Sequence, residues 1–394
     1  MRPGRKKYGT VCPEWNVWAP RAPTGDIPEA LLGRFSELLS ASLATNTWKS
    51  LDSVTRSVES IAQEFALDLS MPWDSSKLLS FILGGSVRGW RASTLRSYAS
   101  RVSSLHQLLG LGQVPISPWA RRMLVGLENS EATKPNKLAV TPFYMRMIRE
   151  QLVKADWTRQ RKRIFWATCC LLFSGSLRSA ELLPGLATSW TPETTLLGRD
   201  IVLRKEKING AWVSYLQLSV KVPKESKNSK QKIVPVELFE QKEAAAWFCP
   251  LRAFTSCLRV VHAGHLDPDL PVFRTANGLG YCPRRFNEDI KLLLSDKLNY
   301  QAGGGISAHC FRAGIASTLA RMGFSEETIA AQGRWSSACY QRLNSVVVTD
   351  CFLMLSFRYV RMGRATRISV QKEVASALAE AARGIQQRDT LLVA

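Results

Sequence analysis

Hydrophobic residues in the first third of the chain recur every three or four positions, which is the spacing of one face of an α-helix. In the clearest case, Leu51, Val54 and Val58 form such a stripe. Helices are predicted over four segments: 48–69, 75–83, 94–109 and 118–127. The pair Gly84-Gly85 is expected to end the second helix. These features predict a small, all-helical domain with basic faces.

The pattern changes at residues 129–139, which are polar, contain a proline and show no period. We interpret them as a linker that follows the helical domain, residues 28–128. Beyond the linker, Thr141-Pro142 is typical of a helix start, with the threonine as N-cap and the proline at the first helical position. Helices are predicted over 142–154 and 159–174.

Three later runs are rich in β-branched and aromatic residues and are separated by polar turns: 201–204, 212–222 and 232–236. Such runs predict a small antiparallel sheet. Helical patterns return from Leu251 onward. The predicted fold class is therefore mainly α with a small antiparallel β-sheet, and residues 140–372 form the second, α+β domain. Residues 1–27 are interpreted as a basic flexible arm and residues 373–394 as a C-terminal helix or tail.

The charge balance narrows the choice of partner. Lys and Arg number 53 against 32 Asp and Glu, which gives a net charge of +21. Such an excess favours nucleic acid first and an anionic membrane surface second, whereas the ordinary alternative is a basic but inert surface. The longest apolar stretch, Ile164 to Phe173, is shorter than the ~20 residues that a membrane-spanning helix needs. We therefore predict no membrane segment.

Cysteine and histidine usage argues against a disulfide scaffold and a zinc site. The nine cysteines include no Cys-x-x-Cys pair, and Cys169 and Cys170 lie within a predicted apolar helix, where cysteine acts as a small hydrophobic residue. The chain has only four histidines. The basic N-terminus lacks the apolar run of a secretory signal. We expect a protein of a reducing compartment that is not secreted and holds no metal.

The first candidate for chemistry follows the break of an apolar helix at Gly175. Beyond it, Arg178 precedes Glu181 by three residues. On a new helical turn this spacing lets the carboxylate reach back and orient the guanidinium. Taken alone, however, such a pair is more simply explained as a helix-surface ion pair.

Two further motifs supply a lysine and a histidine. Residues 221–232 form a lysine-rich turn between two strand-like runs. A lysine there could deliver a proton to a departing oxygen, although such turns are usually only solvated. His309 and Arg312 lie three residues apart on one face of a predicted helix, after the flexible run Gly303-Gly304-Gly305. A lone helical histidine is more often structural.

The fourth motif is Gly333-Arg334-Trp335-Ser336-Ser337, just after a helical stretch. Trp335 would ordinarily be a core residue, but its indole N–H can donate to an anion. Two arginines, a histidine, a lysine and a tryptophan without an acidic cage for a metal indicate phosphoryl transfer in which fixed cationic donors stabilise a pentavalent phosphorane.

In this order, the four motifs resemble those of the tyrosine recombinases. Residues 140–342 resemble that family's α+β catalytic domain, and the helical segment before them resembles its core-binding domain. The Gly-Arg-Trp-Ser-Ser block is similar to the recombinases of eukaryotic DIRS-like retrotransposons and Cryptons, where phage integrases have a second histidine.

The resemblance implies a role for each matching residue. Arg178 and Arg312 would grip the non-bridging oxygens of a DNA phosphate, and Glu181 would support them from behind. His309 would assist proton transfer, and Trp335 would donate a hydrogen bond to the phosphate. For the hairpin lysine, Ser226-Lys227 matches the family's Ser-Lys-Thr turn, so Lys227 is the first candidate and Lys224 the second.

The nucleophile departs from the family's pattern. Its tyrosine is expected eight or nine residues after the tryptophan, where this chain has Leu343 and Asn344. Tyr340 matches an aromatic residue within the block and is interpreted as packing. Removing residues 343–358 joins the two halves of the expected motif and places Tyr359 at the nucleophile's position. We therefore interpret 343–358 as an insertion, either real or an intron translated by error, and Tyr359 as the ancestral nucleophile.

The implied reaction is attack by the tyrosine on a DNA phosphodiester, which gives a 3′-phosphotyrosyl link and a free 5′-hydroxyl without any cofactor. The implied partners are double-stranded DNA and three further copies in a homotetramer, with a C-terminal helix, Glu373 to Arg388, exchanged between neighbours. The alternatives are a catalytically inactive, recombinase-derived DNA-binding protein and a monomeric type IB topoisomerase, which the helical N-terminal domain disfavours. A mobile element of a eukaryotic host would place the protein in the nucleus, and any other host would place it in the cytoplasm.

Overall fold

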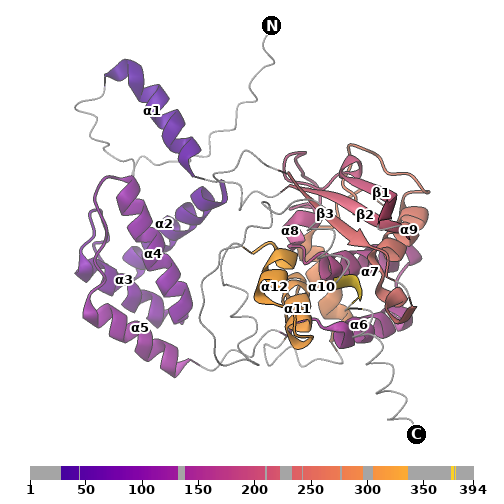
Figure 1. Ribbon diagram of the computed structural model, residues 1–394. Helices are drawn as coiled ribbons and strands as arrows, with labels where there is room; N and C mark the ends of the chain where they lie inside the picture. The colour runs from indigo at the N-terminus through magenta and orange to yellow at the C-terminus, as the bar shows by residue number, and fades with distance from the viewer. Residues whose placement is uncertain are drawn as a thin grey trace. The chain divides into compact units, whose positions relative to one another are not determined.

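The computed structural model describes residues 28–43, 45–131, 138–208, 211–221, 233–241, 243–275, 277–295, 305–335, 374–376 and 378 (Figure 1). The chain divides into two compact units, Met1–Thr133 and Lys134–Ala394. Each unit has a hydrophobic core of its own.

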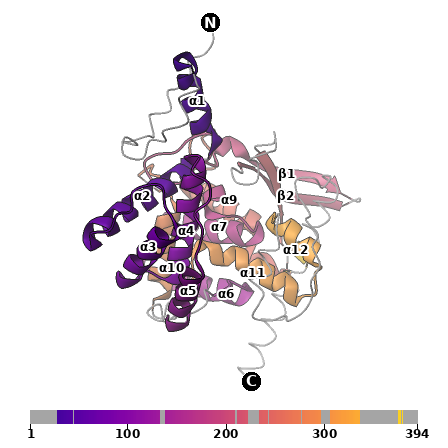
Figure 2. The ribbon, with the colours of Figure 1, turned by 90° about the vertical axis from the view of Figure 1, so that its left-hand side faces the viewer.

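The regular secondary structure in the described part of the first unit is all helical. Its elements are α1 (Glu29–Ser42), α2 (Thr45–Phe65), α3 (Ser75–Val87), α4 (Ala92–Leu108) and α5 (Pro118–Ser130). Helices α2 to α5 pack against one another, as Figures 1 and 2 show. The predicted stripe lies inside: Val54, Val58 and Ile61 pack in the core with Phe81 and Leu95. The predicted helices are confirmed, with ends that differ by a few residues.

The prediction that Gly84 and Gly85 end the second helix is wrong, because α3 continues through both to Val87. The glycines serve close packing instead. A Cβ at Gly84 would lie 2.7 Å from the Ile61 side chain, and one at Gly85 would lie 2.5 Å from that of Leu95. Interatomic separations this short are not tolerated in a packed core, so the neighbouring helices require glycine here.

The second unit contains a three-stranded sheet and a larger set of helices. Its elements are α6 (Pro142–Lys154), α7 (Arg159–Ser174), α8 (Ser179–Leu182), η2 (Gly198–Asp200), β1 (Ile201–Ile208), β2 (Ala211–Lys221), β3 (Ile233–Phe239), η3 (Glu243–Phe248), α9 (Pro250–Val261), α10 (Pro283–Leu294), α11 (Ala308–Arg321) and α12 (Glu326–Gly333). The predicted helices 142–154 and 159–174 coincide with α6 and α7.

The sheet is antiparallel throughout, in the order β1-β2-β3. The central strand alternates as a half-buried strand should: Leu216, Leu218 and Val220 are buried, whereas Gln217 and Ser219 between them are partly exposed. β2 and β3 both contact α9, which covers the buried face. The expected fold class, mainly α with a small antiparallel sheet, is confirmed.

Helix α7 is the centre of the second unit. All its residues from Ile164 to Ser174 are buried, as expected for a helix that is apolar on every side. Cys169 and Cys170 are fully buried, and burial raises the pKa of both thiols well above the ordinary value. They act as small hydrophobic residues, as predicted. Helices α9 and α11 pack directly against α7.

Helix α11 is held close to the chain that precedes α6. The Val140 amide donates to the Cys310 carbonyl at 2.9 Å, and a Cβ at Gly314 would collide with the Val140 backbone. This close approach fixes α11, which carries His309 and Arg312, against the start of the unit. No helix in the described part of the chain is long and apolar enough to cross a membrane.

Candidate phosphate-binding site

Helix α7 ends in a tight turn, and the candidate site residues gather around this turn. The Ser176 amide donates to the Phe173 carbonyl at 3.1 Å, and the Leu177 amide donates to the Leu172 carbonyl at 3.2 Å. This pair of bonds defines a turn in which the residue at position 176 is left-handed. Ser176 has a φ of 46°, although glycine is the usual residue in such a place.

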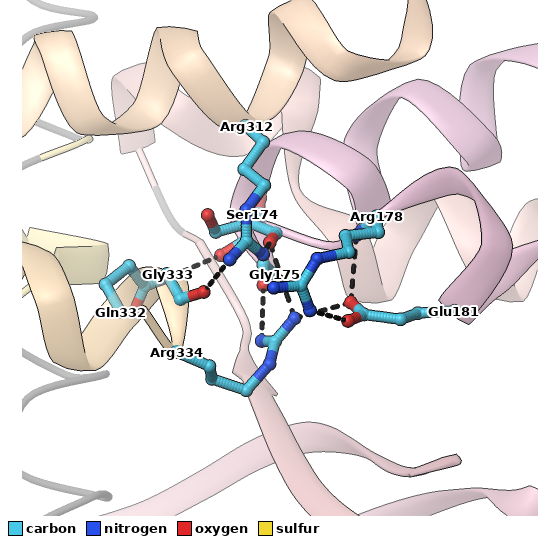
Figure 3. A network of polar contacts seen from close by, with 9 residues as sticks. Ser174, Gly175, Arg178, Glu181, Arg312, Gln332, Gly333 and Arg334 are labelled. Carbon is cyan, nitrogen blue, oxygen red and sulfur yellow. Dashed lines mark hydrogen bonds and ion pairs between the residues drawn. The ribbon is translucent and has the colours of Figure 1, made fainter. Parts of the chain in front are cut away.

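Three successive carbonyls of this turn, those of residues 174–176, accept hydrogen bonds from side chains of α11 and of the end of α12. The bonds run from Gln332 Nε2 to Ser174 at 2.8 Å, from Arg334 Nη1 to Gly175 at 3.0 Å and from Arg312 Nη1 to Ser176 at 2.5 Å (Figure 3). The last carbonyls of a helix lack partners within the helix and lie at the negative end of its dipole. Two guanidinium groups therefore cap the C-terminus of α7.

Glu181 connects these guanidinium groups to Arg178. Its Oε1 lies 2.6 Å from Arg178 Nη1, and its Oε2 lies 2.6 Å from Arg334 Nη2 (Figure 3). The Arg178 amide also donates to Oε2, at 2.8 Å. The carboxylate thus reaches back over one turn to orient the guanidinium of Arg178, as the spacing predicts. We call Arg178, Arg312, Arg334 and Glu181 the arginine cluster.

The cluster is strongly positive and mostly buried. Arg312 is 1 % exposed and the side chains of Glu181 and Arg334 are 3 % and 2 % exposed, whereas that of Arg178 is 31 % exposed. Burial alone would raise the pKa of Glu181, but attraction to Arg334, Arg178 and Arg312 outweighs burial and lowers it. The carboxylate is therefore ionised at neutral pH, and the four side chains together carry two net positive charges.

Trp335 covers Arg312. The Arg312 guanidinium carbon lies 4.6 Å from the centre of the indole ring, within the range of a cation–π contact, and Arg312 also donates to the Gly333 carbonyl. The indole occupies the space that a Cβ at Gly333 would need, so glycine there lets the ring fold back over the arginine. Trp335 is a buried residue that contacts a site arginine, and its predicted hydrogen bond to a phosphate stays a prediction.

His309 lies on the first turn of α11, three residues before Arg312, and its side chain is exposed. Both residues therefore lie on α11, where a helix was predicted, while their predicted service of one phosphate stays a prediction. Arg312 lies inward in the arginine cluster, while His309 lies nearer the solvent. The role of His309 in proton transfer remains a prediction.

Several predicted residues lie outside the described part of the chain. They are both hairpin lysine candidates, Lys224 and Lys227, both tyrosines, Tyr340 and Tyr359, and the expected insertion 343–358. Lys221, the first residue of the lysine-rich turn, is described and has a structural role. It forms an ion pair with Asp200 and donates to the Thr195 carbonyl at 2.8 Å.

Sequence reasoning missed Arg334, although it lay inside a motif that was recognised. Its unusual feature is visible only in the structure, where Arg334 has a φ of 53° at a position that usually holds glycine. Its partners lie more than 150 positions earlier in the chain, so no local pattern reveals them.

No known family model matches the sequence, and no curated protein matches it. Among solved structures, the chain is similar to lambda integrase residues 75–356, a dimer bound to a COC′ core site, with 11 % identity, a TM-score of 0.50 and coverage of 83 % of this chain and 99 % of that one. The chain has the integrase fold. At this identity the similarity concerns the fold alone.

Two further structures are similar at lower scores. The Tn1549 transposon integrase in complex with transposon right-end DNA shares 13 % identity over 78 % of this chain and 91 % of that one, with a TM-score of 0.49. The Flpe–Holliday junction complex shares 13 % identity over 81 % of this chain and 82 % of that one, with a TM-score of 0.35.

Proposed function

We propose that this protein cuts and rejoins DNA strands through a phosphotyrosyl intermediate, as a tyrosine recombinase. The observation that carries the proposal is the arginine cluster, in which three guanidinium groups meet around one carboxylate. The cluster carries two net positive charges, and a DNA phosphodiester is an anion that its guanidinium groups could bind. The net charge of +21 and the integrase fold are consistent with that substrate.

Arg178 is the member of the cluster that can meet a phosphate directly, because its side chain is partly exposed and its guanidinium is oriented by Glu181. Arg312 and Arg334 lie deeper, so in the present arrangement they stabilise the phosphate through space. In a site that excludes water, such fixed charges act strongly on the negative charge that develops on the non-bridging oxygens. Direct contact by Arg312 would need a rearrangement of the groups that cover it.

The proposed step exchanges one phosphoester bond for another. The tyrosine oxygen forms a bond to phosphorus, and the bond from phosphorus to the 5′-oxygen breaks. His309 takes up the phenolic proton, and the hairpin lysine, Lys227 or Lys224, supplies a proton to the departing 5′-oxygen. The ester energy is kept in the protein–DNA link, so reversal by the 5′-hydroxyl rejoins the strand without a nucleotide cofactor.

The proposed nucleophile is Tyr359. It must bring its phenolic oxygen within about 3–3.5 Å of phosphorus for in-line attack. The test uses the full chain and a pool of nicked duplexes of varied sequence, in which the broken strand diffuses away after cleavage and traps the covalent adduct. We expect an adduct that survives denaturing electrophoresis, is lost in Tyr359→Phe and is kept in the matched control Tyr340→Phe.

The same adduct assay also distinguishes a recombinase from a DNA-binding protein without cleavage activity. Retention of DNA that weakens with salt, without an adduct at any salt concentration, would indicate a recombinase-derived DNA-binding protein that has lost cleavage. Adduct that persists in Tyr359→Phe but disappears in Tyr340→Phe would move the nucleophile to the second tyrosine. A transcript that encodes residues 343–358 in frame would establish them as a true insertion.

We further propose kinship with DIRS-like and Crypton recombinases, a tetramer on DNA and a nuclear location in a eukaryotic host. The support for the kinship is the Gly333-Arg334-Trp335 block. Analytical ultracentrifugation of the protein–DNA complex would check the tetramer. A species of one or two protein copies per duplex that still forms adduct would contradict it.

A further inference from the structure

Arg334 stands at the end of α12 in a conformation that does not suit arginine. The Trp335 amide donates to the Ala330 carbonyl at 3.0 Å and the Arg334 amide donates to the Ala331 carbonyl at 3.1 Å, which places residue 334 in the left-handed position of a helix-ending turn. Glycine occupies this position without strain. If residue 334 served only to end the helix, glycine would serve better, so the side chain must account for the arginine.

The contacts of that side chain join α12 to the turn after α7. Its guanidinium donates to the Gly175 carbonyl at 3.0 Å and to the Ser176 carbonyl at 3.4 Å, and it pairs with Glu181 at 2.6 Å. Ser176 also accepts from Arg312, so one carbonyl is shared by two arginines. Figure 3 shows the three guanidinium groups gathered around this turn and the Glu181 carboxylate.

Glu181 is held from both sides. Arg178 uses Oε1, and Arg334 uses Oε2 together with the Arg178 amide. Of these two contacts of Oε2, removal of Arg334 leaves the one with the Arg178 amide, and the carboxylate then gains freedom to rotate. Glu181 in turn orients the partly exposed Arg178 guanidinium. A carboxylate that can rotate would therefore no longer hold that guanidinium in one orientation.

The arrangement is not simply a stabilising ion pair. Arg334 Nε and Ser176 Oγ are both buried with no hydrogen-bond partner among the described residues. Both Ser176 and Arg334 also have positive φ values. Unsatisfied buried groups and strained backbone persist where the surroundings impose them, and they cluster at functional sites. Among the causes that lower the pKa of Glu181, attraction to Arg334 is the largest, which agrees with the geometry.

We propose that Arg334 is a positioning residue of the phosphate site, which fixes Glu181 and through it the guanidinium of Arg178. The inference rests on the proposed phosphate chemistry of the arginine cluster and adds a residue to it. The contacts of Arg334 are with the Gly175 and Ser176 carbonyls and with Glu181, so beside its charge it can act on the reaction through the orientation of Glu181 and Arg178.

The test compares Arg334→Gly, Arg334→Lys and Glu181→Gln in the full chain. Arg334→Gly removes the guanidinium while it relieves the left-handed backbone, so the fold should be kept. We expect its rate of adduct formation on nicked DNA to fall by about 100-fold, the size of a loss from misplaced reacting groups, with little change in DNA retention. Arg334→Lys keeps the charge but lacks the planar fork, so it should recover only part of the rate.

The matched control is Ala263→Gly, which relieves a left-handed residue with a φ of 49° after α9. It should leave adduct formation unchanged. The double variant Arg334→Gly with Glu181→Gln should be no slower than the slower single variant, because both act on Arg178 through one carboxylate. Additive losses would show that Arg334 acts independently of Glu181 and would overturn the inference.

A second measurement separates this inference from the proposed cleavage activity. Inorganic phosphate binding to the intact chain is measured by calorimetry, with Arg178→Ala expected to abolish it and Arg334→Gly to weaken it by about tenfold. Weaker phosphate binding in Arg334→Gly without adduct in the wild-type chain would sink the cleavage proposal and keep the positioning role. Adduct rates and phosphate affinities equal to wild type in Arg334→Gly would overturn the positioning role alone, and a wild-type chain with neither adduct nor phosphate binding would overturn both.

Discussion

Two buried carboxylates of the second unit, Glu181 and Asp289, are each held by two arginines, yet they are built differently. Asp289 pairs with Arg161 at 2.6 Å and with Arg285 at 3.2 Å, and it accepts a hydrogen bond from the Tyr281 hydroxyl at 2.7 Å. Arg161 also stacks on Trp157, 3.9 Å from the ring centre. This set ties α7 to α10.

The two sets differ in where their positive charges lie. At Asp289 both arginines reach solvent, with side chains 29 % and 50 % exposed, so water screens them. At Glu181 two of the three guanidinium groups are buried. Burying cations beyond those that one carboxylate can neutralise costs stability. The Asp289 set therefore fits a structural tie between helices, and the Glu181 set fits the anion site that we propose.

The largest expected difference is between Arg178→Ala and Arg161→Ala. Arg178→Ala should reduce adduct formation by at least about 10³-fold, because it removes the cation that meets the phosphate, while DNA retention changes little. Arg161→Ala should leave the adduct rate unchanged and lower the free energy of unfolding by about 2 kcal/mol, since Arg285 still partners Asp289. Rates on nicked DNA and urea unfolding measure the two effects. Equal adduct rates in the two variants would remove the distinction between the sets.

Neutralising the carboxylates gives the next contrast. Asp289→Asn should lower the free energy of unfolding by about 3 kcal/mol, as breaking a buried ion pair does, without slowing adduct formation in the folded fraction. Glu181→Gln should slow adduct formation, because Arg178 loses its orienting partner. A Glu181→Gln variant that cleaves at the wild-type rate would contradict the role assigned to this carboxylate.

Glu181 should also contribute to the dependence of the free energy of unfolding on pH in the acid range. Attraction to three arginines lowers the pKa of Glu181 in the folded chain against the opposing effect of burial. Its contribution to stability is therefore complete above the ordinary glutamate pKa of about 4.3 and is lost as pH falls through the lowered folded value. Urea unfolding at pH 6 and below pH 4 should show a smaller pH dependence in Glu181→Gln than in wild type. An unchanged pH dependence in this range would argue against the ionised pair.

The smallest expected effect is at Tyr281. Burial, followed by the charge of Asp289 and the hydrogen bond to it, raises the pKa of the Tyr281 hydroxyl well above its ordinary value. Tyr281→Phe should cost about 1–2 kcal/mol of unfolding free energy, through the lost hydrogen bond to a charged group, and leave the adduct rate unchanged. Difference spectra in the ultraviolet should show one fewer tyrosine that resists ionisation in alkali. A change in adduct rate would connect the Asp289 set to the phosphate site after all.

Interactions between residues close in sequence could be predicted from the sequence. Helices α6 and α7 coincide with the predicted ranges because their apolar periods and their start signals lie within a few residues of each other. The ion pair between Arg178 and Glu181 also follows from spacing alone, since three residues along a helical turn bring the groups together.

Close approach between distant segments could not be predicted. The sequence of α3 contains two glycines that look like a helix end, and only the packing of Ile61 and Leu95 shows why the helix continues through them. In the same way, the partners of Arg334 lie on the turn after α7.

The sequence by itself determined many of the helices and the three strands, the mainly helical fold class with its small sheet, and the types of residue available for phosphate chemistry. Only the tertiary structure decided that Arg312 and Arg334 cap the C-terminus of α7, that Trp335 covers Arg312, and that Arg178 is the arginine left at the surface. The physical reason is the distance along the sequence over which each effect acts. Periodicity and capping act over one or two turns, whereas burial and charge compensation depend on whichever segments the fold brings together.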